Sequence, residues 1–157
     1  MTLDPIDRRI LVQLQRDGRL SHVELAERIG LSPTPCTRRV RALERAGVIQ
    51  GYAALVEPRK VGLAIQAIVQ VKLERHSDEI VARFRREMLE RPEVLACQAM
   101  TGDMDFLLQV MVRDVDALSD FTLRRLLRLP GVRDVRTGLV LETVKRSTVV
   151  PLDDANA

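Results

Sequence analysis

The most constraining feature of the sequence is the run at residues 31–44, which predicts a short helix with one apolar face. At about 100° per residue, Cys36, Val40 and Leu43 fall on one narrow stripe that should pack inward. The opposite side of the helix carries Thr34, Arg38, Arg41 and Arg45. Guanidinium groups are suited to phosphates and to the paired acceptors of guanine. The charges alone leave two interpretations open, a nucleic-acid contact or an ordinary solvated surface helix.

Two capped helices precede this run and place it in a helix-turn-helix. A proline and an acidic residue after Asp4 predict a helix through about Arg16. Residues 21–24 form a capping box that starts a second helix, and Gly30 ends it after two turns. The third helix is expected to begin about two residues later, with Ser32 as its cap, which is the spacing of a helix-turn-helix.

The apolar spacing of these segments predicts the core of a small N-terminal unit. The residues expected to pack inward are Ile6, Ile10 and Leu14 in the first helix and Val23, Ala26 and Ile29 in the second. Residues 47–49 should end the third helix, and residues 52–56 read as a short strand. Three capped helices followed by a strand suit a winged DNA-binding unit.

Charge is distributed unevenly along the 157 residues. Residues 1–60 carry 11 Lys and Arg against 7 Asp and Glu, a net charge of +4, whereas residues 61–157 carry 14 against 15, a net charge of −1. The basic half is therefore the half with the helix-turn-helix. No apolar run approaches membrane-spanning length and the start has no signal-peptide pattern, so we expect a cytoplasmic protein without a membrane partner. We expect Cys36 and Cys97 to be small buried residues and no metal to be bound.

The second half of the chain repeats one pattern in outline. The expected elements are a strand at 64–73, a helix at 77–90, strands at 94–100 and 106–112, a helix at about 115–129 and a strand at 132–144. Two successive βαβ units predict a ferredoxin-like βαββαβ sandwich, with one four-stranded antiparallel sheet and both helices on one face. The strands also offer apolar side chains on the other face, so a second copy of the chain is the expected cover.

The segment at residues 101–105 lies between the two middle strands and allows three interpretations. Its glycine and aspartates are ordinary turn residues, which favours a hairpin. Exposed backbone amides and an aspartate would alternatively suit the carboxylate and the ammonium group of a free amino acid. A metal or acid–base site is the third interpretation, but neither histidine has ligand spacing and hairpin tips are open to water. We therefore expect no catalytic residue and no enzyme.

Several ordered motifs resemble the Lrp/AsnC (leucine-responsive/asparagine regulator) family of bacterial and archaeal transcription regulators. The motifs are LDxID from Leu3, LSPTPC from Leu31, RVRxLE from Arg39, GxIxGY from Gly47, TGDxDFLL from Thr101 and LPGV from Leu129. They extend from residue 3 to about residue 148. The resemblance implies an α+β chain with a helix-turn-helix DNA-binding domain at 1–50, a hinge strand and linker at 51–62, and a ferredoxin-like amino-acid-binding and oligomerisation domain at 63–157.

The resemblance also implies which residues contact double-stranded DNA. Recognition helices at residues 32–46 of two protomers would enter successive major grooves about 34–36 Å apart. We expect Arg38 and Arg41 at base edges or adjacent phosphates, and Arg45 at phosphate only. The complete predicted DNA-binding set is Ser32, Thr34, Pro35, Thr37, Arg38, Arg41 and Arg45.

The effector implied by the resemblance is a small amino acid, bound at an oligomer interface beside residues 101–105. The positions that govern effector response in the family correspond to Ala99, Asp105, Val115, Gly138, Leu139 and Val140. Asp105 is the expected ammonium partner. Gly138 departs from the family pattern, in which a bulkier residue is common, so we expect a larger pocket and a larger or aromatic amino acid. The complete predicted effector-binding set is Ala99, Thr101, Gly102, Asp103, Met104, Asp105, Val115, Thr137, Gly138, Leu139 and Val140.

The resemblance further implies a homodimer that assembles into octamers or other rings, with no cofactor besides the amino acid. The expected function is sequence-specific regulation of transcription in amino-acid metabolism, at the nucleoid, with the effector changing the relative stability of dimers, octamers and hexadecamers. Two alternatives remain. One is an architectural, chromatin-like DNA-binding protein with weak specificity, and the other is a stand-alone regulatory amino-acid-binding subunit of an enzyme.

Overall fold

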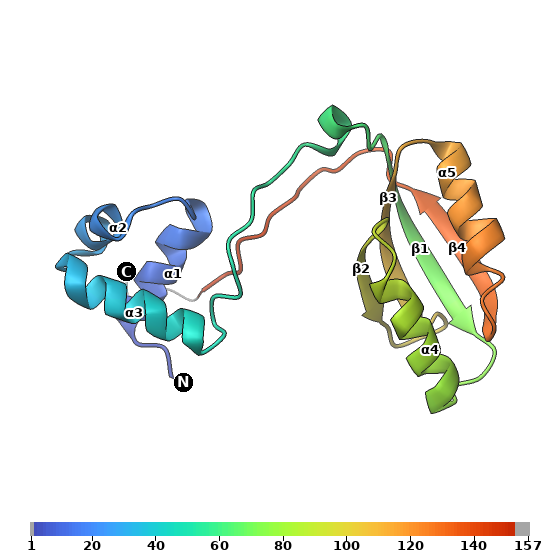
Figure 1. Cartoon of the computed structure of the whole chain (residues 1–157), viewed down its shortest axis with the longest axis horizontal. Helices are drawn as coiled ribbons and strands as arrows, with labels where there is room; N and C mark the ends of the chain where they lie inside the picture. Colours follow the sequence, from blue (N-terminus) through green and yellow to red (C-terminus); the bar gives the residue numbers. More distant parts are fainter. Residues whose placement is uncertain (1, 153–157) are drawn as a thin grey trace. The chain divides into compact units, whose positions relative to one another are not determined.

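The computed structural model describes residues 2–152, which form two compact units (Figure 1). The first unit contains the residues up to Leu55 together with those from Lys145 onward, and the second unit runs from Val56 to Val144. Each unit has its own cluster of buried apolar side chains. Met1 and residues 153–157, which the predicted domains include, lie outside the described residues.

Three helices make up most of the first unit. They are α1 (Pro5–Arg16), α2 (His22–Ile29) and α3 (Pro33–Arg45). The predicted caps of α1 and α2 are confirmed, because Asp4 and Ser21 each accept a hydrogen bond from the backbone N–H three residues later. Gly30 ends α2 with a left-handed backbone (φ 70°). Ser32 is the N-cap residue of α3, but its side chain makes no capping hydrogen bond.

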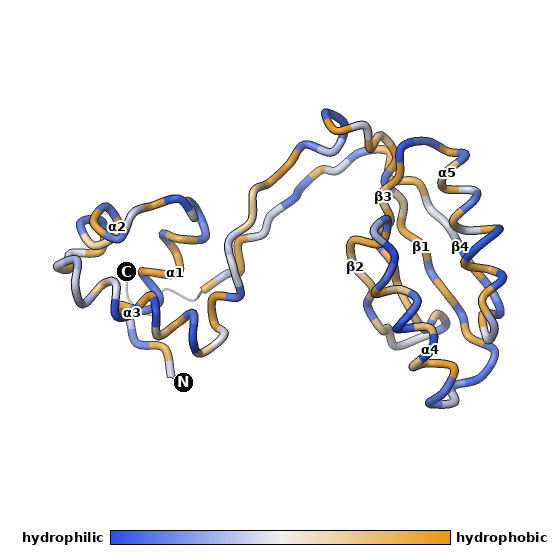
Figure 2. The backbone as a smooth tube through the Cα atoms, viewed as in Figure 1, coloured by the Kyte–Doolittle hydropathy of each residue, from blue (hydrophilic) through white to orange (hydrophobic). Residues whose placement is uncertain are grey.

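The core of the first unit takes side chains from all three helices. The predicted stripe of α3 is confirmed, since Cys36, Val40 and Leu43 are all buried. The prediction for Val23 is wrong: its side chain is 51% exposed, and Leu25 is buried instead. At about 100° per residue, positions two residues apart lie on nearly opposite sides of a helix, so Val23 faces away from the side on which Leu25 is buried. Hydrophobic positions alternate with hydrophilic ones along these helices (Figure 2).

The C-terminal segment at residues 145–152 returns to this unit, whereas the sequence places it with the second domain. The Gln15 side chain of α1 donates from Nε2 to the backbone oxygen of Val150 at 3.2 Å and accepts from the Val150 N–H at 2.6 Å. Leu152 packs against the core of the helices. These contacts explain why the segment groups with the first unit.

The strand predicted at residues 52–56 is absent from the structure. A strand needs a hydrogen-bonded neighbour, and the described part of the chain provides none for this segment. Its apolar side chains are exposed, Leu55 at 82% and Val56 at 58%. The first unit therefore has three helices without a hydrogen-bonded wing. A single 3-10 turn, η1 (Pro58–Val61), follows.

The second unit confirms the predicted ferredoxin-like arrangement. Its elements are β1 (Ile65–Leu73), α4 (Asp78–Leu89), β2 (Val94–Ala99), β3 (Phe106–Val112), α5 (Val115–Ser119) and β4 (Val132–Leu139). The strands form one sheet in the order β2-β3-β1-β4, and every neighbouring pair is antiparallel (Figure 1). The buried residues of β1 pack with side chains of both helices, such as Phe84 and Leu118, so both helices cover the same face.

Two elements of the second unit differ from the prediction. The last helix is not uniform, because α5 continues into a π-helical segment, η2 (Asp120–Leu126). Thr122 in this segment donates its hydroxyl to the backbone oxygen of Leu118 at 2.9 Å. β4 ends at Leu139 rather than at residue 144, and one further backbone hydrogen bond to β1 follows it, from the Val140 N–H to the backbone oxygen of Gln66 at 2.9 Å.

The two faces of the sheet differ in character. On the helix-covered face, alternate residues of β1 are buried, from Ala67 to Leu73. The opposite face mixes polar and apolar side chains, namely Gln66, Ile68 and Gln70 of β1 and Leu107, Gln109 and Met111 of β3. The predicted burial of Cys97 is wrong, because β2 is an edge strand and this side chain is exposed.

Candidate functional sites

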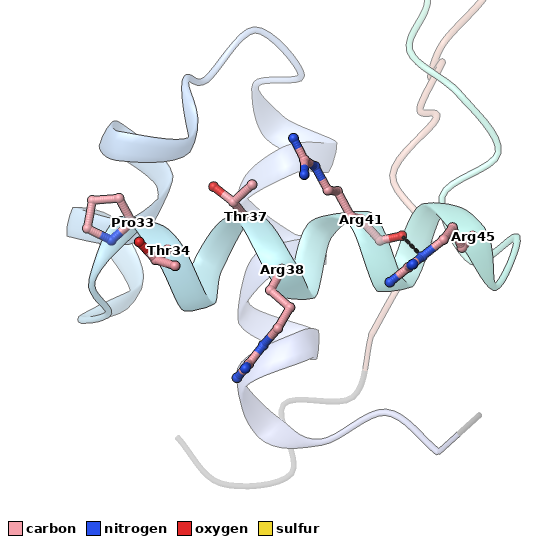
Figure 3. A pocket seen from close by; sticks show the side chains of 6 residues that line it. All are labelled: Pro33, Thr34, Thr37, Arg38, Arg41 and Arg45. Carbon is pink, nitrogen blue, oxygen red and sulfur yellow. Dashed lines mark hydrogen bonds between the residues drawn. The ribbon is translucent and has the colours of Figure 1, made fainter.

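The exposed side of α3 forms the first candidate site, a groove of about 450 Å³ (Figure 3). Its lining residues are Pro33, Thr34, Thr37, Arg38, Arg41 and Arg45. Five of these six belong to the predicted DNA-binding set, and Pro33 is the addition. The structure leaves Ser32 and Pro35 of the predicted set out of the lining, although both lie at the start of the same helix.

The three arginines of this groove are exposed to solvent. None of the ion pairs found within residues 2–152 engages Arg38, Arg41 or Arg45. Arg45 turns its Nε–H back to the backbone oxygen of Arg41 at 3.2 Å, while the guanidinium group of Arg38 extends away from the helix (Figure 3). Cationic groups without carboxylate partners on one helix face make a surface suited to DNA phosphates.

Arg39, in the middle of the same helix, has a different role. Its Nη1 lies 2.6 Å from Oδ2 of Asp4 and 2.9 Å from Oδ1 of the buried Asp7. These hydrogen bonds raise the pKa of the guanidinium group. The hydrogen bond from the Asp7 N–H, together with Arg39, outweighs partial burial and lowers the pKa of Asp4. Arg39 therefore anchors α3 to α1, a role that sequence reasoning missed because the partners lie more than thirty residues away.

Two more contacts fix α3 against its neighbours. Thr37 Oγ1 lies 3.1 Å from Nδ1 of His22 at the start of α2. The Tyr52 hydroxyl donates to Oε1 of Glu44 at 3.1 Å. Burial is the larger cause of a raised pKa of Tyr52, and the Glu44 carboxylate raises it further. Thr37, which itself lines the groove, and Glu44 therefore help to set the orientation of the arginine face.

The second candidate site is the connection between β2 and β3. The N–H of Met100 donates to the backbone oxygen of Asp105 at 2.9 Å, which closes the connection as a hairpin. Gly102 at its tip has a left-handed backbone (φ 109°), which favours glycine there. Met104 is buried, whereas residues 101–103 are exposed. The loop therefore presents its tip to solvent and anchors itself through Met104.

Both carboxylate oxygens of Asp105 are engaged within the second unit. Oδ2 accepts a hydrogen bond from the Leu73 N–H at 2.7 Å, and Oδ1 lies 2.7 Å from Nε2 of His76. Burial raises the pKa of Asp105, but the Leu73 N–H, His76 and Lys72 outweigh this effect and lower it. Asp105 is thus an ionised group that also ties the loop to the end of β1. Sequence reasoning missed His76, because no local pattern relates it to a residue 29 positions away.

The predicted effector residues divide into two groups. Ala99 and residues 101–105 lie where β1 ends, since Phe106 pairs with Val71. Val115 and residues 137–140 lie from the middle to the start of β1, where Thr137 pairs with Val69 and Leu139 pairs with Ala67. Val71 and Ala67 of β1 are about 14 Å apart at about 3.4 Å per residue, and β2 and β4 are opposite edges of the sheet. Within one protomer the two groups thus lie on opposite edges of the sheet.

Gly138 is exposed and its glycine is not required by the backbone. A Cβ added there would meet only the backbone oxygen of Ile68, at 4.0 Å, and no left-handed φ applies. The missing side chain therefore leaves open space beside β4.

No helix within residues 2–152 is long and apolar enough to span a membrane.

Comparison with known proteins gives one family match in each half of the chain. Residues 3–50 match the family described as winged helix-turn-helix DNA-binding, and residues 66–150 match the Lrp/AsnC ligand binding domain. The leucine-responsive regulatory protein of Escherichia coli K12 is 46% identical over 145 residues, which cover 92% of this chain and 88% of that protein. The protein of the same name from Salmonella typhimurium LT2 has the same identity and coverage.

Solved structures agree with these matches. A transcriptional regulator of Neisseria meningitidis in complex with L-methionine is 44% identical with a TM-score of 0.92, and the alignment covers 97% of this chain and 98% of that one. AsnC of Escherichia coli is 26% identical with a TM-score of 0.87, over 96% and 100% of the two chains. The chain therefore belongs to the Lrp/AsnC family, as a DNA-binding transcription regulator, not an enzyme, that carries an amino-acid effector domain.

Proposed function

We propose that the chain binds specific DNA sequences by placing α3 in the major groove. The observation that carries this proposal is the groove of α3, in which Arg38, Arg41 and Arg45 are exposed and without carboxylate partners among the described residues. Arg38 and Arg41 contact base edges or adjacent phosphates, and Arg45 contacts phosphate. The predicted polar and proline residues at the helix start position it against the DNA backbone, namely Ser32, Thr34, Pro35 and Thr37.

A comparison of two DNA duplexes tests this specificity. One duplex is selected by the full chain from a random library, and the other is an unselected duplex of equal length, measured at matched salt concentration. A gene-specific regulator should prefer the selected duplex by about a thousandfold or more. Equal affinities, with the same salt dependence, would instead identify an architectural protein that binds phosphates without reading bases.

We infer that the amino-acid effector binds between copies of the chain. The two groups of predicted effector residues lie at opposite edges of the sheet, which supports a site that takes the 101–105 loop from one protomer and the 137–140 segment from another. The N. meningitidis relative was solved with L-methionine, which makes this amino acid the first ligand to test. The open space at Gly138 supports a larger side chain in the ligand.

Calorimetry of the full chain against the twenty common amino acids tests the effector proposal. Methionine or phenylalanine should bind more tightly than alanine or glycine, because the space beside β4 admits a larger side chain. The reverse order would overturn the size preference. If none of the twenty amino acids binds, the effector proposal itself fails.

We also propose a homodimer that assembles further into octamers. The exposed apolar side chains of Leu55 and Val56, and the mixed open face of the sheet, support burial against a second copy. The effector then changes the relative stability of dimers, octamers and hexadecamers, for which a coupling of about 1–3 kcal/mol is sufficient. Sedimentation with and without L-methionine should show two distributions of assembly size.

Because it acts on DNA, the protein is proposed to reside at the nucleoid in the cytoplasm.

A further inference from the structure

His76 lies in the turn between β1 and α4, and its side chain reaches the loop before β3. Its Nε2 is 2.7 Å from Oδ1 of Asp105. The His76 side chain is 67% exposed, whereas that of Asp105 is only 13% exposed. The imidazole ring is therefore the solvent-facing member of the pair, and it occupies one oxygen of a largely buried carboxylate.

The other oxygen of Asp105 is committed to the backbone. Oδ2 accepts the Leu73 N–H at 2.7 Å, and the Asp105 N–H donates to the backbone oxygen of Val71 at 2.9 Å. Together these hydrogen bonds join the loop to the end of β1, so freeing Oδ2 would leave a backbone N–H of the sheet without a partner. A ligand ammonium group that approaches Asp105 is therefore directed to Oδ1, the oxygen that His76 occupies.

The charged groups around this pair are few. Lys72 faces the Asp105 carboxylate and donates from Nζ to the backbone oxygen of Asp103. The turn that holds His76 contributes the neighbouring charged residues Glu74 and Arg75, and α4 contributes Asp78, its first residue. Carboxylate, lysine and arginine side chains ordinarily keep their charge between about pH 5.5 and pH 7.5, whereas histidine changes its charge in this range. His76 is the one imidazole among these residues.

We propose that His76 sets the affinity of the effector site by competing with the ligand's ammonium group for Oδ1 of Asp105. Protonated His76 forms an ion pair with the carboxylate and must be displaced, whereas the neutral ring gives a weaker hydrogen bond that the ammonium group replaces. The inference rests on the proposed function of the 101–105 loop as part of an amino-acid site. Acidification through the histidine range should therefore weaken binding of a free amino acid.

Calorimetry with L-methionine and the full chain tests this competition. Between about pH 5.5 and pH 7.5, the affinity of the wild-type chain should rise about fivefold or more. His76→Gln keeps an N–H donor without the charge, and its affinity should be high and independent of pH. His22→Gln removes the other histidine of the chain and should keep the wild-type pH profile. His76→Lys carries a lasting positive charge and should bind weakly at every pH.

Two results would overturn the competition. One is a pH profile of His76→Gln that matches the wild-type profile, and the other is a His76→Lys variant that binds as tightly as His76→Gln. Both outcomes leave the effector site itself intact, because methionine still binds. Absence of methionine binding by the wild-type chain at every pH, with normal circular dichroism, would overturn the proposed methionine site together with the competition.

Discussion

Arg39 contacts the buried carboxylate of Asp7, with 2.9 Å between Nη1 and Oδ1, and this contact ties α3 to α1. The same nitrogen also reaches Asp4, the residue that caps α1. An arginine in the middle of a basic helix thus holds the helix in place, while its neighbours Arg38 and Arg41 face outward. Loss of Arg39 should therefore affect stability, whereas loss of Arg38 should not.

Replacing Arg39 by methionine should destabilise the first unit. Arg39→Met keeps an apolar stem but leaves the Asp7 carboxylate without its charged partner, which should lower the free energy of unfolding by about 1–3 kcal/mol. Arg38→Met is the matched control, and a change within about 0.5 kcal/mol is expected there. Urea denaturation followed by circular dichroism measures both variants. Equal midpoints for the two variants would contradict the anchoring role of Arg39.

Acid should weaken the first unit through Asp4. Because its pKa is lowered in the folded chain, Asp4 contributes stability that is complete above its unfolded pKa and is lost as the pH falls through its folded pKa. The free energy of unfolding should therefore fall below about pH 4, the ordinary carboxyl range. Asp4→Asn should be less stable at pH 7 and show a shallower acid decline. A decline as steep as that of the wild-type chain would exclude this contribution.

Two glycines should respond differently to alanine. At Gly131, which has a φ of 90°, an added Cβ would lie 2.4 Å from Cγ2 of Ile80, so Gly131→Ala should cost about 1–3 kcal/mol. At Gly138 the nearest atom would be 4.0 Å away, and Gly138→Ala should leave stability nearly unchanged. Thermal unfolding of both variants gives the comparison, and comparable losses at the two positions would be incompatible with these contacts.

The open space at Gly138 should also affect ligand choice. Gly138→Tyr would fill this space, so the proposed effector site should lose affinity for phenylalanine and methionine relative to alanine. Calorimetry with the three amino acids measures the ratio of affinities. Gly138→Ala adds little volume and serves as the control. An unchanged ratio in Gly138→Tyr would place the ligand side chain elsewhere.

Features that depend on neighbouring residues in the chain could be predicted from the sequence. The caps at Asp4 and Ser21 act over three residues, and the stripe of Cys36, Val40 and Leu43 lies on one helix, so both are confirmed. Helical spacing failed for Val23, because a helix of eight residues has too few apolar positions to fix its buried side unambiguously.

Features that depend on distant partners could not be predicted. Whether residues 52–56 form a strand depends on a neighbouring strand, and the length of β4 depends on how far its pairing with β1 continues. The Arg39 anchor and the Asp105–His76 pair join residues about thirty positions apart. The candidate DNA-binding face was therefore largely predictable, since it lies on one helix, whereas the surroundings of Asp105 required the folded sheet.

DNA affinity of arginine variants tests most directly whether the exposed face of α3 reads DNA. The wild-type chain, Arg38→Ala and Arg9→Ala are compared by fluorescence anisotropy on a duplex selected by the wild-type chain, and on variants of that duplex with single base-pair changes. Arg9 is an exposed arginine of α1 outside the groove, so it controls for loss of charge. Arg38→Ala should lose about 1–3 kcal/mol and relax the preference at one base pair, while Arg9→Ala keeps both. Equal affinities for Arg38→Ala and the wild-type chain on every duplex would contradict recognition through this face.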